Sequence, residues 1–146
     1  PGERLVIVAD GAVVLAALNG IGALDYTGWA SQAAASEDLT QLCPGAWVQP
    51  GAAEQRDQAG QGRNVRTMRA WIVVLTVSSD DGTALEEIAG PLTEAVRDAL
   101  TGLTVGDEKP PRRLRYVSEM EPFYAPGYME LPLEFELTET FRGDTQ

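Results

Sequence analysis

The residue types that usually carry enzyme chemistry are scarce in this sequence. Histidine is absent, which removes the commonest general base and metal ligand together with every Ser-His and Cys-His nucleophile pair. The single cysteine, Cys43, has no second cysteine for a disulfide or a cysteine-rich zinc site, so we expect it to pack as a small apolar residue. The composition favours a structural or binding protein over an enzyme.

Carboxylates are the remaining groups that could do chemistry. Asp80-Asp81 followed by Glu86-Glu87 could hold a metal ion, but the spacing lacks the alternating ligands of an EF-hand loop. A turn followed by a helix cap explains the same residues. An enzyme that uses only carboxylates, such as a glycosidase, is a further alternative. We expect no catalytic residue, no cofactor and no metal.

The length and charge bound the class of protein. A chain of 146 residues with 44% hydrophobic residues is typical of one globular domain, here residues 1–146. Its 22 acids and 11 bases give a formal charge of −11, which repels nucleic acid and anionic lipid. The apolar stretch at residues 5–18 is interrupted by Asp10 and too short to span a bilayer, and its single preceding base argues against a cleaved signal peptide.

The N-terminal half is predicted to contain one helix and an irregular segment. Residues 3–18 have helical spacing, and a strand at residues 5–9 is the alternative; the expected buried stripe is Leu5, Val8, Ala12, Leu15 and Ala16. Residues 20–66 are rich in Gly, Ala, Gln, Ser and acids, so we expect a loop-rich insertion anchored by Trp29 and Trp47. Within it we expect a short strand at residues 46–49 and a mobile loop at residues 51–62.

The C-terminal half has stronger signals. Residues 67–78 are apolar on both faces, which is typical of a central strand. A capping box formed by Thr83 and Glu86 opens a helix over residues 83–101, and Pro91 should either kink that helix or begin a second one. Residues 112–120 are predicted to form a third strand, followed by a turn at residues 122–127.

Residues 128–141 alternate cleanly and predict a long closing strand. One side carries Met129, Leu131, Leu133, Phe135 and Leu137, and the other carries Glu130, Pro132, Glu134, Glu136 and Thr138. The apolar side should pack on the helices, and the glutamate side should face water or a partner. The predicted fold is a single α+β domain with a mainly antiparallel or mixed sheet of about four strands and two helices on one face.

Two groups of residues are candidates for an interface. Arginines gather before and within the central strand (Arg63, Arg66 and Arg69) and at the start of the third strand (Arg112, Arg113 and Arg115). A right-handed crossover between the two strands would place both clusters at one sheet edge, either as solvated strand ends or as a docking patch for an acidic surface. The aromatic residues Phe123, Tyr124 and Tyr128 lie in a turn, where they either fold back onto the core or contact a protein partner.

The C-terminal half resembles the tail terminator proteins of long-tailed bacteriophages, including the Mu-like group. The resemblance covers residues 70–142, and it rests on the order and texture of four segments: WIVVLTVSS, EEIAGPLTEAVRDAL, RYVSEM and LPLEFELTETF. It implies a structural subunit of the virion that assembles in the host cytoplasm as a hexameric ring at the head-proximal end of the tail.

Such a ring caps the tail tube, stops its polymerisation and contacts head-completion or neck proteins. Genomic DNA passes through without specific binding, and we expect Glu130, Glu134 and Glu136 to line or border the channel, where negative charge repels phosphates. Another head–tail connector or tail-completion ring protein is the nearest alternative. A small-molecule-binding module with an apolar pocket near Trp29 and Trp47 is a more remote one.

Overall fold

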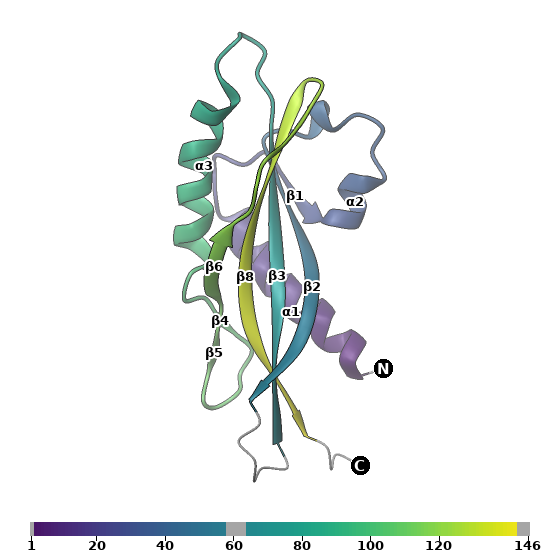
Figure 1. Cartoon of the computed structure of the whole chain (residues 1–146), viewed down its shortest axis with the longest axis vertical. Helices are drawn as coiled ribbons and strands as arrows, with labels where there is room; N and C mark the ends of the chain where they lie inside the picture. The colour runs from purple at the N-terminus through teal and green to yellow at the C-terminus, as the bar shows by residue number, and fades with distance from the viewer. Residues whose placement is uncertain (1, 58–63, 143–146) are drawn as a thin grey trace.

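The computed structural model describes residues 2–57 and 64–142. Helices and strands alternate irregularly along this part of the chain (Figure 1). The helical elements are α1 (Gly2–Asn19), α2 (Ala30–Ala34), the 3-10 helix η1 (Leu39–Leu42) and α3 (Leu85–Leu100). The strands are β1 (Tyr26–Trp29), β2 (Gly45–Asp57), β3 (Asn64–Val77), β4 (Thr104–Val105), β5 (Arg112–Arg113), β6 (Arg115–Glu119), β7 (Phe123–Ala125) and β8 (Tyr128–Arg142).

Six of the described strands form one mixed sheet in the order β1-β2-β3-β8-β6, with β7 also paired to β8. β1 runs parallel to β2, and the other neighbours are antiparallel. β3 lies at the centre, as its two apolar faces predict. The α+β class is therefore confirmed. The expected number of strands was too low, because the short strands β1 and β7 lie in segments that carry turn residues.

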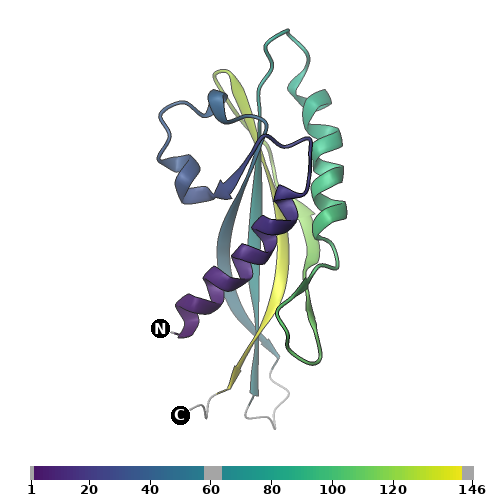
Figure 2. The ribbon, with the colours of Figure 1, turned by 180° about the vertical axis from the view of Figure 1, so that it is seen from behind.

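The two long helices, α1 and α3, lie on the same side of the sheet (Figure 2). The core fills the space between these helices and the sheet. Its buried side chains include Trp71, Leu75, Phe135, Val14 and Leu100. The predicted alternation of the closing strand is confirmed: the apolar residues of β8 face the helices, and all are buried except the half-buried Leu131.

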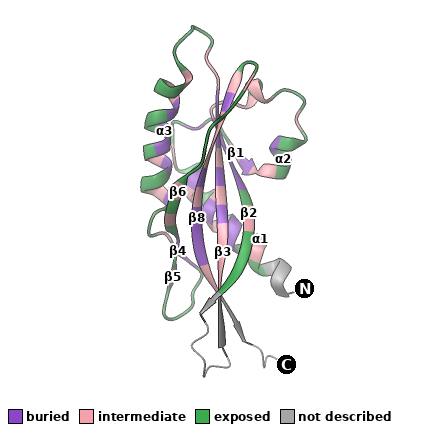
Figure 3. Cartoon of the chain, in the orientation of Figure 1, coloured by how far each residue is buried: buried purple, intermediate pink, exposed green. Residues whose placement is uncertain are grey.

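The other side of the sheet is called here the open face. Strand alternation places Met68, Ala70, Ile72 and Val74 of β3 on it, and all four are half-buried. The segment of residues 30–44 covers only the end of this face where β3 finishes; there Trp47 Nε1 donates to Thr76 Oγ1 at 3.1 Å. Figure 3 shows the remaining front of the sheet as a mixture of buried, half-buried and exposed residues.

The N-terminal helix is confirmed, and the alternative strand at residues 5–9 is wrong. The predicted buried stripe is also wrong, since Val8, Ala12 and Ala16 are exposed. The helix is apolar all round, so hydrophobic spacing could not choose a face. The buried side is instead set by two residues that are not large and apolar: Asp10, which meets a buried arginine, and Gly11, which lies against Trp29.

Residues 20–66 are more regular than predicted, because they contain β1, α2, η1, all of β2 and the start of β3. The short strand expected at residues 46–49 continues through Pro50 to Asp57, so residues 51–57 of the expected loop are strand. Proline is tolerated there because β1 pairs with β2 only as far as Val48, so Pro50 lies on a free edge beside a bulge. Residues 58–62 lie outside the described residues.

The helix predicted at residues 83–101 is a single element, so the second-helix alternative for Pro91 is wrong. The capping box is also wrong. The cap position is Ala84, which makes no side-chain cap bond, and Thr83 instead donates from its backbone nitrogen to Asp81 Oδ1 at 3.1 Å. The acidic residue of the expected box, Glu86, bonds to a tyrosine of another element.

The third strand, predicted over residues 112–120, is broken at the buried Leu114. Before the break, β5 pairs with β4; after it, β6 pairs with β8. The predicted turn at residues 122–127 contains β7, so the connection itself shortens to Pro126-Gly127. Gly127 has φ +87°, a conformation that favours glycine and allows this tight hairpin.

Candidate assembly surfaces

The first arginine of the predicted docking patch, Arg112, forms its hydrogen bonds within the chain. Its Nη1 and Nη2 donate to the two carboxylate oxygens of Asp10, each at 3.0 Å, and Nη1 also donates to the carbonyl of Thr138. The side chains of Arg112 and Asp10 are only 9% and 4% exposed. The hydrogen bonds to Asp10 raise the pKa of Arg112. The structure corrects the prediction for Arg112, which joins α1 to the sheet instead of facing a partner.

Two further arginines of the predicted clusters are paired with glutamates. Arg115 binds Glu136 across β6 and β8, and Arg69 Nε donates to Glu139 Oε2 at 2.6 Å. The glutamate of the first pair is buried, which corrects the prediction that Glu136 is part of a free acidic face. These pairs cancel most of the local positive charge that a docking patch needs.

The two clusters do lie at the same end of the sheet. β3 and β6 run parallel but are separated by β8, and one row of the register contains Ala70, Glu136 and Arg115. Of the remaining cluster members, Arg113 is exposed, Arg66 lies in β3, and Arg63 lies outside the described residues.

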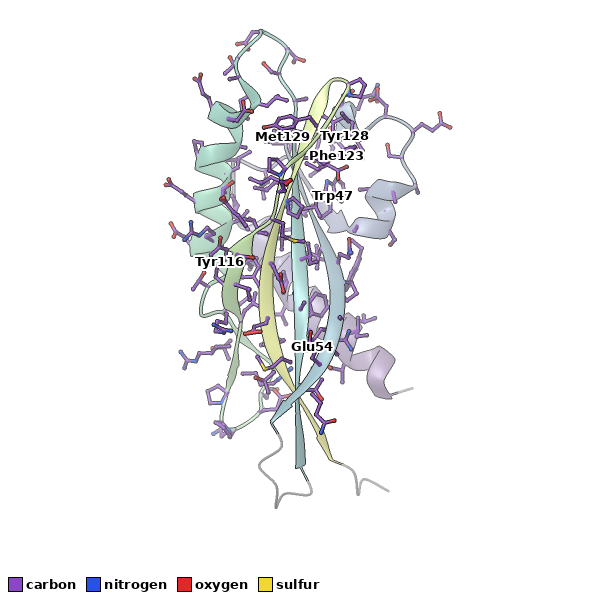
Figure 4. All side chains as sticks on the ribbon, viewed as in Figure 1. Trp47, Glu54, Tyr116, Phe123, Tyr128 and Met129 are labelled. Carbon is purple, nitrogen blue, oxygen red and sulfur yellow. The ribbon has the colours of Figure 1, made fainter. Side chains whose placement is uncertain are left out.

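The aromatic residues of the β7–β8 hairpin divide between two environments. Phe123 and Tyr124 are 58% and 54% exposed, so these two do not fold back onto the core, whereas Tyr128 is half-buried. Tyr124 lies on the helix side, where its hydroxyl donates to Glu86 Oε2 of α3 at 2.6 Å. This bond raises the pKa of Tyr124 and lowers that of Glu86. Figure 4 shows Phe123, Tyr128 and Met129 near one another at this end of the molecule.

A groove that sequence reasoning missed separates α3 from the hairpin. It has a volume of about 290 Å³, a floor that includes Ala89 and Met129, and acidic residues such as Glu94 and Glu119 at its sides. The Tyr124–Glu86 bond lies at the same place, so α3 holds the hairpin in position. No sequence signal pairs these two residues, which are 38 positions apart.

The open face carries the predicted glutamates. Alternation and register place Glu130 and Glu134 there, both half-buried, beside the strand β3. A depression of about 230 Å³ lies between β2, β3 and β8, with Met68 and Ile72 in its lining and Glu54 and Glu134 among its acids. Figure 4 shows Glu54 toward the opposite end of the sheet from the hairpin. The face is therefore acidic with an apolar floor.

The structure does not support the remote alternative of an apolar pocket near Trp29 and Trp47. Register and alternation place the two indoles on opposite faces of the sheet. On the helix side, the ring centroids of Trp29 and Trp71 are 6.4 Å apart. On the open face, Trp47 donates a hydrogen bond to Thr76. Both residues do anchor their segment, as predicted.

Two of the four acids that we considered as metal ligands, Asp81 and Glu86, have structural partners. Asp81 accepts hydrogen bonds from Thr83 and Ser79, chiefly the Thr83 side chain, which lowers its pKa, and Glu86 accepts from Tyr124. Among the described residues, no group of three or more Cys, Asp or Glu side chains is placed to hold a metal ion.

The cysteine is half-buried, and its Sγ donates to the carbonyl of Leu39 at 3.2 Å. Burial raises the pKa of Cys43, which keeps the thiol protonated and poorly nucleophilic. No helix in the described part of the chain combines the length and apolarity needed to cross a lipid bilayer.

The fold and surfaces define a small α+β domain with exposed aromatic residues and an acidic sheet face. The sequence model of the phage tail terminator protein family matches residues 9–146, nearly the whole chain. This chain belongs to that family and is therefore a structural protein of a bacteriophage tail. A search of curated proteins finds no match.

Proposed function

We propose that this chain forms a hexameric ring that caps the head-proximal end of the tail tube, stops tube polymerisation and contacts the head-completion or neck proteins. The family match over nearly the whole chain carries this proposal. The ring would be a virion component, assembled in the host cytoplasm with the tail tube protein as its first partner. A structural role also fits the composition, which lacks histidine.

The exposed hairpin supplies a contact surface. Phe123 and Tyr124 present two aromatic side chains to solvent, and such residues are enriched at protein interfaces. Their backbone is fixed by pairing to β8, and Tyr124 is further fixed by its bond to Glu86. A surface that is ordered before binding loses less conformational entropy on association.

The acidic open face suits a channel through which DNA moves. We propose that Glu130 and Glu134 border this channel, because fixed negative charge repels phosphates and discourages binding. The third predicted glutamate, Glu136, contributes less because Arg115 neutralises it.

The proposed channel can be tested by charge reversal. The double variant Glu130→Lys/Glu134→Lys should assemble but retain DNA, with binding that weakens as salt rises. The control variant Glu87→Lys/Glu94→Lys makes the same charge change on exposed positions of α3 and should retain none. Equal DNA retention by both variants would show that net charge alone, and not the open face, controls DNA binding.

The capping role can be tested with purified tail tube protein. Tube lengths measured by electron microscopy should stop increasing once this chain is added, and the double variant Phe123→Ser/Tyr124→Ser should arrest growth less well with an unchanged circular dichroism spectrum. Tyr26→Ser, at a residue 41% exposed in β1, is the matched control and should arrest growth normally. Tubes that keep growing in the presence of the unmodified chain would refute the capping role.

A further inference from the structure

The exposed large apolar side chains of the described residues fall mainly into two groups. The first group is Val117, Met120, Phe123 and Tyr124, each between 39% and 58% exposed. β6 and β7 both pair with the side of β8 that faces away from β3, and the nitrogen of Met120 donates to the carbonyl of Pro132 between them. These four residues therefore follow one continuous border of the sheet, called here the β6–β7 edge.

The second group lies on α1, where Val6 and Val8 are 42% and 54% exposed. Exposed alanines at positions 9, 12 and 16 continue this apolar surface, which is called here the α1 flank. Figures 1 and 2 show α1 crossing the sheet diagonally, with its N-terminal end beyond β2 and away from β6. The β6–β7 edge and the N-terminal part of the α1 flank thus lie at opposite sides of the subunit.

The charged residues of the two surfaces differ, and this difference disfavours one of the possible contacts between copies. The β6–β7 edge contains the exposed acids Glu119 and Glu121, so two such edges facing one another would oppose like charges. The α1 flank has no exposed charged residue between Val6 and Asn19, because Asp10 is buried and paired with Arg112.

We propose that the β6–β7 edge of one copy packs against the α1 flank of the next copy. The two surfaces differ and lie at opposite sides of the subunit, so the contact is heterologous and repeats from copy to copy until the ring closes. This arrangement leaves the open face uncovered. The inference rests on the proposed function, which supplies the ring, and it adds the identity of the two surfaces.

Cysteine cross-linking of the full chain tests this contact directly. In a Cys43→Ser background, Val8→Cys and Met120→Cys place single thiols on the two surfaces at exposed positions. A short bis-maleimide should link the mixture of the two variants, assembled with tail tube protein, and should link neither variant alone. One chain carrying both substitutions should give a ladder of linked species that ends at the ring. Val8→Cys mixed with Ser31→Cys is the matched control and should stay unlinked. Ser31 lies in α2, which follows β1 at the edge of the sheet opposite to β6.

The outcomes separate this inference from the proposed function. Links within Met120→Cys alone or Val8→Cys alone would show a symmetric contact and overturn the heterologous one. Rings or capped tubes without any link in the mixture would overturn the inference while leaving the proposed function intact. An unmodified chain that forms no ring, alone or on tail tubes, would overturn both.

Discussion

Asp10 and Arg112 are 102 positions apart in the sequence, yet they form a two-point ion pair inside the subunit. The pair joins the middle of α1 to β5, and the same guanidinium reaches the backbone of β8 through the carbonyl of Thr138. Three elements therefore meet at one side chain. This contact also determines which side of α1 faces the sheet, because Asp10 needs a buried partner.

Arg112→Ala should destabilise the fold. Removing one partner of a buried ion pair leaves the other charge uncompensated, which costs about 3–5 kcal/mol. Arg113→Ala, the control at an exposed neighbour, should change the free energy of unfolding by less than about 0.5 kcal/mol. Urea denaturation of both variants measures the difference, and equal small effects would show that the ion pair does not hold α1 in place.

Gly11→Ala should destabilise the fold although alanine is the better helix former by about 1 kcal/mol. A Cβ at position 11 would fall within the indole ring of Trp29, so the helix or the ring must move. Overpacking of this kind costs about 1–3 kcal/mol. The control Gly90→Ala lies in α3 with no atom within 4 Å of the added Cβ and should be stabilising. Thermal unfolding that ranks the two variants in the opposite order would contradict the close contact.

Phe135→Ala should be among the most damaging core substitutions. The side chain is fully buried, and the centroid of its ring lies 5.5 Å from the ring centroid of Tyr116 in an edge-to-face arrangement. Loss of a buried phenylalanine costs about 3–5 kcal/mol, a large part of the stability of an ordinary domain. Denaturant unfolding that shows a loss below about 1 kcal/mol would mean that this site is not core.

The Tyr124–Glu86 bond should depend on pH at both extremes. The lowered pKa of Glu86 means that its contribution is present above about pH 4.3 and is lost as the pH falls through the lowered value. The raised pKa of Tyr124 means that its contribution is present below about pH 10 and is lost as the pH rises through the raised value. The bond is therefore intact across the neutral range.

Tyrosinate absorbance can measure this contact. The titration of the unmodified chain minus that of Tyr124→Phe should have its midpoint above the ordinary tyrosine pKa, and Glu86→Gln should move that midpoint back toward it. A midpoint that does not respond to Glu86→Gln would show that the bond is absent in solution.

The strongest periodic signals in the sequence predicted the fold best. The alternation of residues 128–141 and the apolar run of residues 67–78 each define a strand without help from the rest of the chain. Prediction failed where tertiary contacts decide the outcome. Apolar residues lie on all sides of α1, so their spacing gives no preferred face. The orientation of α1 depends instead on the ion pair between Asp10 and Arg112. The strand β2 passes through Pro50-Gly51, a turn signal that a free sheet edge and a bulge accommodate.

The candidate surface residues were predicted unevenly for a similar reason. The sequence placed Phe123 and Tyr124 in a turn but left open whether they fold back onto the core; the structure shows both exposed at a hairpin. Whether Arg112 and Glu136 are exposed depends on partners that are distant in sequence. These pairings cannot be read from a single sequence. Both residues are buried in ion pairs within the subunit.

The proposed ring at the end of a tail tube can be tested on assembled tail tubes. The most direct measurement is electron microscopy of tail tubes assembled with the chain, with averaging of the tube ends. We expect one six-fold ring at one end of each tube, with the chain absent from the tube wall and from the opposite end. Bare ends, or the chain distributed along the tube wall, would contradict it.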